Sequence, residues 1–159
     1  MFRRFAVLAL VVVLTACAKE KPVAPDALPA PVAGAIQARF PGSKVIEASR
    51  EKEKDKLLYD VELEHQGRRL EVEIDPNGGI VQIEAPIALH ELPAEAARAL
   101  EQRYPNEQVR EVEQKTEVVD GQDKVVSYEV RLVTSEKKAL EVEVTPDGRI
   151  LAEEPDATK

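Results

Sequence analysis

Hydrophobic and charged residues alternate along much of the chain. In residues 59–64 and again in 69–74, every second side chain is apolar and those between are charged. A period of two predicts strands with one buried and one solvated face. A turn at Gln66-Gly67 brings the apolar positions of the two strands together, as the register of a hairpin requires. The expected opposite pairs are Leu63 with Leu70, Val61 with Val72, and Tyr59 with Ile74.

The same alternation returns in residues 128–132 and 140–144. Each predicted hairpin follows a strand that begins at Lys44 or Gln108 and precedes a stretch with Pro and Gly at turn positions, 75–79 or 145–149. The second hairpin is expected to pair Leu132 with Leu140, Val130 with Val142, and Tyr128 with Val144.

A different period marks residues 29–40 and 93–104. Apolar residues recur there at every fourth position, which predicts two helices with one apolar stripe each. Pro29 and Pro93 suit a first helical turn, and Pro41 and Pro105 end the helices because the residue before a proline leaves the α region. The stripes consist of Val32, Ile36 and Phe40, and of Ala96, Leu100 and Tyr104.

These elements occur twice in the same order. The segment LPAPVAGAIQARFPG from Leu28 is matched by LPAEAARALEQRYPN from Leu92, and EVEIDPNGGI from Glu71 by EVEVTPDGRI from Glu141. Extra residues of the second copy fall within 116–124, where we expect a longer hairpin turn. The predicted class is α+β, with two tandem repeats (28–87 and 88–154), each one helix packed on a roughly four-stranded antiparallel sheet.

The N-terminus has the pattern of an export signal. Arg3 and Arg4 precede an apolar run that is short for a membrane span, and Leu14-Thr15-Ala16-Cys17 resembles the bacterial lipobox. We therefore expect a lipoprotein signal peptide at 1–16 and acyl lipid on Cys17. Residues 17–27 would form the lipidated Cys and a flexible tether, so that structure begins near Leu28, and 155–159 would form a disordered tail. With no Asp after Cys17, the expected location is the outer membrane, facing the periplasm.

Composition narrows the function. The formal net charge is −8 and Trp is absent, which disfavours nucleic acid and anionic membranes as direct partners. The expected contact with the membrane is through the lipid anchor only. Cys17 is the single cysteine, so after lipidation the domain would have no disulfide or thiol nucleophile.

Catalytic and metal-binding motifs are missing from the sequence. His65 and His90 are the only histidines, and no HExxH or nucleophile elbow occurs. We interpret both as solvated surface residues and expect no enzyme activity. The stretch from Asp75 opens like a calcium loop but has Ile80 and Pro86 where an EF-hand needs Gly and Glu. A hairpin turn is the better interpretation, and we expect neither a metal site nor a cofactor beyond the lipid on Cys17.

The outward positions of the predicted hairpins are acidic. The register places Glu62 opposite Glu71, Asp60 opposite Glu73 and Glu129 opposite Glu143; Glu64 with Arg69 and Arg131 with Glu141 are favourable pairs. One interpretation is a solvated face whose charges discourage aggregation. The other is an acidic patch that binds a basic protein segment or, weakly, divalent cations. The candidate partner-binding residues are Asp60, Glu62, Glu71, Glu73, Glu129 and Glu143.

The order of these motifs resembles the PepSY-like family, which is related to the tandem-repeat β-lactamase inhibitory proteins. The shared motifs, over residues 28–154, are the Leu-Pro helix start, the Phe/Tyr-Pro helix stop and the final turn before Ile150. The resemblance implies an exported, non-catalytic binding or inhibitory module. In this chain the register turns Tyr59 and Tyr128 toward the helix-covered face.

Three functions fit this sequence. The leading hypothesis is a lipid-anchored envelope module that binds or restrains another exported protein, an enzyme or peptidase, through its open sheet face. The alternative is an acidic lipoprotein that binds or senses divalent cations. A third is a structural envelope component whose sheet extends by edge pairing.

Overall fold

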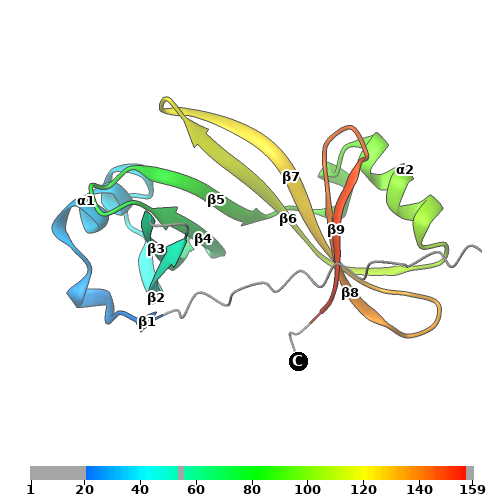
Figure 1. Cartoon of the computed structure of the whole chain (residues 1–159), viewed down its shortest axis with the longest axis horizontal. Coiled ribbons are helices and arrows are strands. Elements are labelled where there is room, and N and C mark those ends of the chain that lie inside the picture. The colour runs from blue at the N-terminus through cyan, green and yellow to red at the C-terminus, as the bar shows by residue number, and fades with distance from the viewer. Residues whose placement is uncertain (1–20, 54–55, 157–159) are drawn as a thin grey trace, which may run out of the picture.

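The computed structural model describes residues 21–53 and 56–156. The signal peptide and Cys17 lie outside this range. Within these described residues, two helices, two 3-10 turns and nine strands follow one another (Figure 1). Their bounds are β1 Lys21–Pro22, η1 Pro25–Ala27, α1 Ala30–Arg39, β2 Lys44–Glu53, β3 Lys56–His65, β4 Arg68–Ile74, β5 Ile80–Pro86, η2 Leu89–Glu91, α2 Ala94–Arg103, β6 Gln108–Val119, β7 Gln122–Val133, β8 Ala139–Val144 and β9 Ile150–Pro155.

Proline sets the limits of both helices, as predicted. Pro29 and Pro93 are the N-cap residues of α1 and α2. The C-cap residues, Phe40 and Tyr104, directly precede Pro41 and Pro105, and each donates its backbone N–H to a carbonyl oxygen of the last helical turn. Val32 and Ile36 of α1 are buried, as are Ala96 and Leu100 of α2. The apolar stripes therefore face the sheet.

All nine strands belong to one antiparallel sheet, in the order β1 to β9. The expected fold, two tandem repeats that each pack one helix on a roughly four-stranded sheet, is therefore wrong. The reason is the pairing of β5 with β6, which joins Gln82 to Glu117 and Pro86 to Glu113. In Figure 1 the sheet runs continuously between α1 at one end of the molecule and α2 at the other.

The registers predicted for the two central hairpins are confirmed. All the apolar pairs expected between β3 and β4 and between β7 and β8 are Cα partners. The turn after β3 uses positive φ at Gln66 and Gly67, which matches the twist of the strands it joins.

Two hydrophobic cores lie on the same face of this sheet. One contains Val32 and Ile36 with Tyr59 and Val72, and the other contains Leu100 with Tyr128. Ile83 of the first core pairs with Thr116 of β6, and Val112 of the second core lies four residues away on β6. Positions of equal parity on a strand share a face. Both helices therefore cover one face and leave the opposite face without a helix among the described residues.

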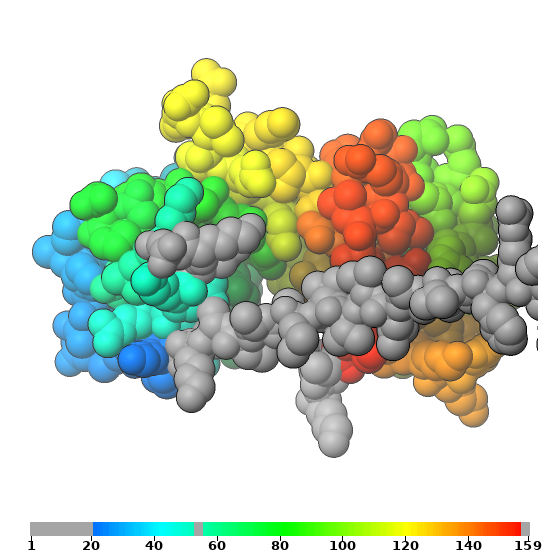
Figure 2. Space-filling model, in the orientation of Figure 1, coloured from blue at the N-terminus to red at the C-terminus, as the bar shows by residue number. Residues whose placement is uncertain are grey.

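The N-terminal boundary and the long hairpin differ from expectation. Lys21 and Pro22 pair with Arg50 and Ser49, so the described structure starts before Leu28. The extra residues around 116–124 lengthen β6 and β7 and do not enlarge the turn, since Val119 still pairs with Gln122. The tip of this hairpin projects from the body (Figure 2) and contacts α1 through an ion pair between Arg39 and Asp123.

Candidate functional site: the open face

The face without helices carries the outward side chains of β2 to β8, and we call it the open face. It is a polar surface because the outward positions of the alternating strands are charged. One row of successive Cα partners crosses six strands: Glu47, Glu62, Glu71, Glu84, Lys115 and Ser127. The face also includes Ser49, Asp60, Arg69, Glu73, Gln82, Glu113, Glu129, Arg131, Glu141 and Glu143.

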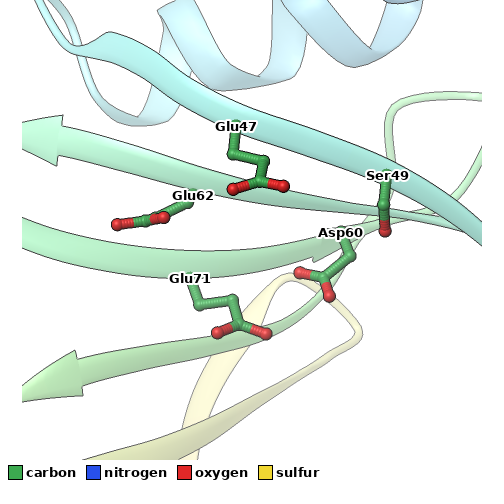
Figure 3. Close-up of a pocket in the computed structure, with 5 residues that line it drawn as sticks. All are labelled: Glu47, Ser49, Asp60, Glu62 and Glu71. Atoms are coloured by element: carbon green, nitrogen blue, oxygen red, sulfur yellow. The ribbon is translucent and has the colours of Figure 1, made fainter. Parts of the chain in front are cut away.

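At one end of this row lies a small pocket of about 150 Å³, which we call the acid pocket. Figure 3 shows the carboxylates of β2, β3 and β4 that surround it. The lining residues are Glu47, Ser49, Asp60, Glu62 and Glu71. With four carboxyl groups around one hollow, the acid pocket has the charge and dimensions to receive a cationic side chain.

In the free protein, partial burial and the clustering of carboxylates in the acid pocket disfavour the ionised form of Glu71. Partial desolvation, then the carboxylates of Asp60 and Glu84 and a hydrogen bond with Asp60, raise the pKa of Glu71 to about 7. Arg69 forms an ion pair with Glu62 at 2.6 Å, although its Cα partner is Glu64. The predicted oppositions of Glu62 with Glu71 and of Asp60 with Glu73 are confirmed.

Lys115 joins the two ends of the open face. Its ammonium group lies 3.2 Å from Glu84 and 3.8 Å from Glu143. Desolvation by itself lowers the pKa of Lys115, but the carboxylates of Glu84, Glu143 and Glu129 together outweigh it, so that the pKa is raised. The Ser127 hydroxyl also donates a hydrogen bond of 2.6 Å to Glu143. The ammonium group of Lys115 on β6 therefore connects carboxylates of β5 and β8.

Arg131 is the centre of a second charged cluster. Its guanidinium lies 2.7 Å from Glu111, 3.0 Å from Glu129, and 3.4 Å from both Glu113 and Glu141. Desolvation, followed by the neighbouring Glu141 and Glu84, still raises the pKa of Glu129 to about 7. Desolvation likewise raises the pKa of Glu113. One guanidinium does not balance four carboxylates at this depth.

The residues that resembled a calcium loop form a turn. The Asp75 carboxylate accepts hydrogen bonds from the backbone N–H groups of Asn77 and Gly79 at 2.7 and 3.0 Å, so the hairpin interpretation is confirmed. In residues 21–53 and 56–156, no group of three or more His, Cys, Asp or Glu side chains is placed to hold a metal ion. His90 is exposed, whereas His65 is half-buried and packs edge-on against Phe40 with ring centroids 5.7 Å apart.

The structure divides the predicted partner-binding residues into two groups. Asp60, Glu62 and Glu71 line the acid pocket, with Glu73 beside them as the Cα partner of Asp60. Glu129 and Glu143 lie near Arg131 and Lys115. Sequence reasoning missed Glu47, Glu84, Lys115 and the central position of Arg131. The alternation of Glu111, Glu113, Lys115 and Glu117 is the signal that marks β6 as part of this face.

Comparison with known proteins supports the resemblance inferred from the motifs. Residues 35–82 match the PepSY family, the peptidase propeptide and YPEB domain. The resemblance to PepSY proteins is therefore confirmed for this segment, which reaches from α1 into β5. None of the curated proteins matches the sequence.

Solved structures show the same fold across most of the chain. A BLIP-like protein from Bacteroides fragilis NCTC 9343 is 18% identical, with a TM-score of 0.55 over 81% of this chain and 86% of its own. A protein from Bacteroides eggerthii DSM 20697, described as periplasmic, has a TM-score of 0.62 and 17% identity over 80% of this chain and 88% of its own. A DUF2874 family protein from Bacteroides uniformis ATCC 8492 has 17% identity and a TM-score of 0.61, with coverage of 80% and 88%.

In the described part of the chain, neither helix has the length and apolar character to span a bilayer.

Proposed function

We propose that this protein is a non-catalytic, lipid-anchored module of the cell envelope that binds another exported protein through the open face and restrains it. The observation that carries the proposal is the row of opposed carboxylates on that face. Directly opposed like charges cost about 0.2–1 kcal/mol each in a sheet, and they are retained here together with a raised pKa at Glu71 and Glu129. Solubility requires charge, but it does not require carboxylates gathered around one hollow.

The fold and the N-terminus support this role and this location. Proteins of this fold include one described as BLIP-like and one described as periplasmic, and the PepSY match covers residues 35–82. An inhibitor-like module acts by occupying a surface of its target, which requires an exposed face on a rigid scaffold. The partner would be an exported enzyme or peptidase. The lipobox-like segment ending at Cys17 would keep the module on the outer membrane, facing the periplasm.

Site-specific crosslinking tests the binding face. A photoreactive amino acid placed at Glu71, in living cells that carry the full chain, is expected to form an adduct with one exported protein. The same probe at Glu101, an exposed position on α2, is the matched control and is expected to form none. Adducts of equal yield at both positions, or none at Glu71, would remove the open face as the binding site.

Charge reversal and calcium titration separate the remaining hypotheses. Glu71→Lys should abolish the adduct formed by a photoprobe at the neighbouring Glu73, whereas Glu101→Lys should leave it unchanged. If the face instead binds divalent cations, calorimetry with calcium chloride on the full chain will give heat that Glu71→Lys removes. In that case the cation-binding alternative replaces the present proposal.

Lipid anchoring at Cys17 can be tested separately. Cys17→Ala is expected to abolish incorporation of labelled palmitate and to move the protein out of the membrane fraction, since two or more acyl chains are needed for stable anchoring. The measurement is fractionation followed by immunoblotting. Retention of the Cys17→Ala protein in the membrane fraction would contradict lipid anchoring.

A further inference from the structure

Beside the acid pocket the structure has a larger groove, of about 580 Å³. It lies between the start of β3, the turn from β4 to β5 and the end of β6, and we call it the tip groove. Its apolar lining consists of Leu57, Leu58, Pro76, Val81, Val118 and Val119, and its polar lining consists of Lys56, Glu73, Asp75, Asn77, Gln82 and Glu117.

Exposed apolar side chains gather in this groove. Among the described residues, Leu57 is 36% exposed, Val81 38% and Val119 52%. The other large exposed apolar residues, Leu89 and Leu151, do not line the tip groove. Contiguous exposed apolar surface with a polar rim is typical of a binding site.

The long hairpin explains why these side chains are together. Because β6 extends to Val119 before its turn, its end reaches past Gln82 and lines the groove together with the start of β3. The projecting hairpin is visible in Figure 2. Arg39 and Asp123 hold the tip against α1, and Val118 packs on the first core. The end of the long hairpin that lines the tip groove is therefore attached to the rest of the fold at two points.

The rim of the groove is mainly acidic and continues into the acid pocket. Glu73 and Glu117 lie in one cross-strand row, on either side of Gln82. Glu73 is two residues from Glu71 on the same strand and is the Cα partner of Asp60. Two residues along a strand span about 7 Å, so the two hollows lie within reach of neighbouring side chains of one bound segment. Among the described residues that line the two hollows, Lys56 is the only cation.

We infer that the two hollows together receive one extended segment of the partner, with an apolar side chain in the tip groove and a lysine or arginine side chain in the acid pocket. This inference rests on the proposed function, because it specifies the chemistry of the partner at the open face. Charge complementarity selects the basic residue, since four carboxyl groups line the acid pocket. The exposed side chains of Val119 and Val81 favour an apolar residue of the partner in the tip groove, next to that basic residue.

Mapping of the attached segment tests this chemistry. A photoreactive amino acid at Val119 in the full chain is expected to attach, in cells, to a segment of the same exported protein that is captured at Glu71. Mass spectrometry of the crosslinked peptide should show an apolar residue with Lys or Arg within about two residues. The probe at Leu89, exposed but outside the groove, is the matched control and should form no adduct.

Single substitutions in each hollow then test whether both hollows bind the partner segment. Val81→Ser should abolish the adduct at Val119, and Glu71→Lys should abolish it as well, whereas Leu89→Ser and Glu101→Lys should leave it intact. Attachment to a second copy of this chain, to its own N-terminal segment, or to a segment without a basic residue would overturn the inference. If the adduct at Glu71 forms while Val119 yields none, the open face binds a partner without the tip groove, and only the further inference fails. If Glu71 also yields none, the proposed function fails.

Discussion

Replacing Gly78 with alanine is expected to lower the free energy of unfolding by about 2–4 kcal/mol. Gly78 lies in the turn between β4 and β5 with φ of +89°, and a Cβ atom added there would lie 2.6 Å from the carbonyl oxygen of Pro31. Positive φ strains any residue with a Cβ, by roughly 1–2 kcal/mol. Contact with the backbone at the start of α1 adds overpacking that no side-chain rotation relieves.

Gly67→Ala is the matched control for this substitution. Gly67 also has positive φ, +75°, but no atom lies within 4 Å of its added Cβ. It should therefore lose only the conformational part, about 1 kcal/mol. Urea unfolding followed by circular dichroism gives both values. Equal losses of unfolding free energy in the two variants would mean that the close contact between Gly78 and Pro31 does not contribute to the effect.

The same contact exists at the other helix. Gly148 has φ of +85°, and its added Cβ would lie 2.6 Å from the carbonyl oxygen of Glu95 in α2. Each of the turns that resembled one another in the sequence thus packs against the first turn of a helix. Gly78 and Gly148 are required both for the turn and for this close approach.

Local features of the fold could be predicted because short turns fix them. Gln66-Gly67 leaves only one register in which Val61 meets Val72, and proline at 41 and 105 fixes the helix ends. The number of sheets could not be predicted in this way. Residues 87–107, which include α2, separate β5 from β6, so no turn geometry sets their register. Thr116, a polar residue at a buried position, also obscures the alternation that marks β6 as a central strand.

For the candidate site, too, the local features could be predicted from the sequence and the long-range ones could not. The opposition of Glu62 and Glu71 follows from one hairpin, so three of the acid-pocket residues, Asp60, Glu62 and Glu71, emerged from the sequence. The link through Lys115 depends on the pairing of β5 with β6. The tip groove depends on the length of β6, which places Val119 beside distant segments. Neither is encoded in a local pattern.

Glu129→Gln is expected to stabilise the protein above neutral pH. The Glu129 side chain is 15% exposed, and its pKa is raised from 4.5 to about 7. Since the folded state binds the proton more tightly than the unfolded state, this residue favours folding most below pH 4.5 and loses that contribution as the pH rises to 7. The amide resembles the protonated carboxyl group and has no charge to desolvate. The expected gain at pH 8 is about 1–3 kcal/mol.

The charged groups around Glu129 set the sign of this prediction. They come from β5, β6, β7 and β8 and are Glu84, Glu111, Glu113, Lys115, Arg131, Glu141 and Glu143. Arg131 keeps Glu111, Glu113 and Glu141 as partners in the variant. The gain over the unmodified protein should therefore grow from near zero at pH 5 to its full value at pH 8.

Thermal unfolding between pH 5 and pH 8 measures this profile, with Glu101→Gln on the exposed surface of α2 as a control that should show no such trend. A loss of stability at pH 8 would show that the ion pair with Arg131 outweighs the desolvation of Glu129. The expected gain has a functional meaning, because a carboxylate that destabilises the free protein needs another reason to be there. Contact with a cationic group of a partner would hold Glu129 in the ionised form and offset that loss. Stabilisation of Glu129→Gln together with weaker crosslinking at Glu71 would connect the strain of the open face with its use in binding.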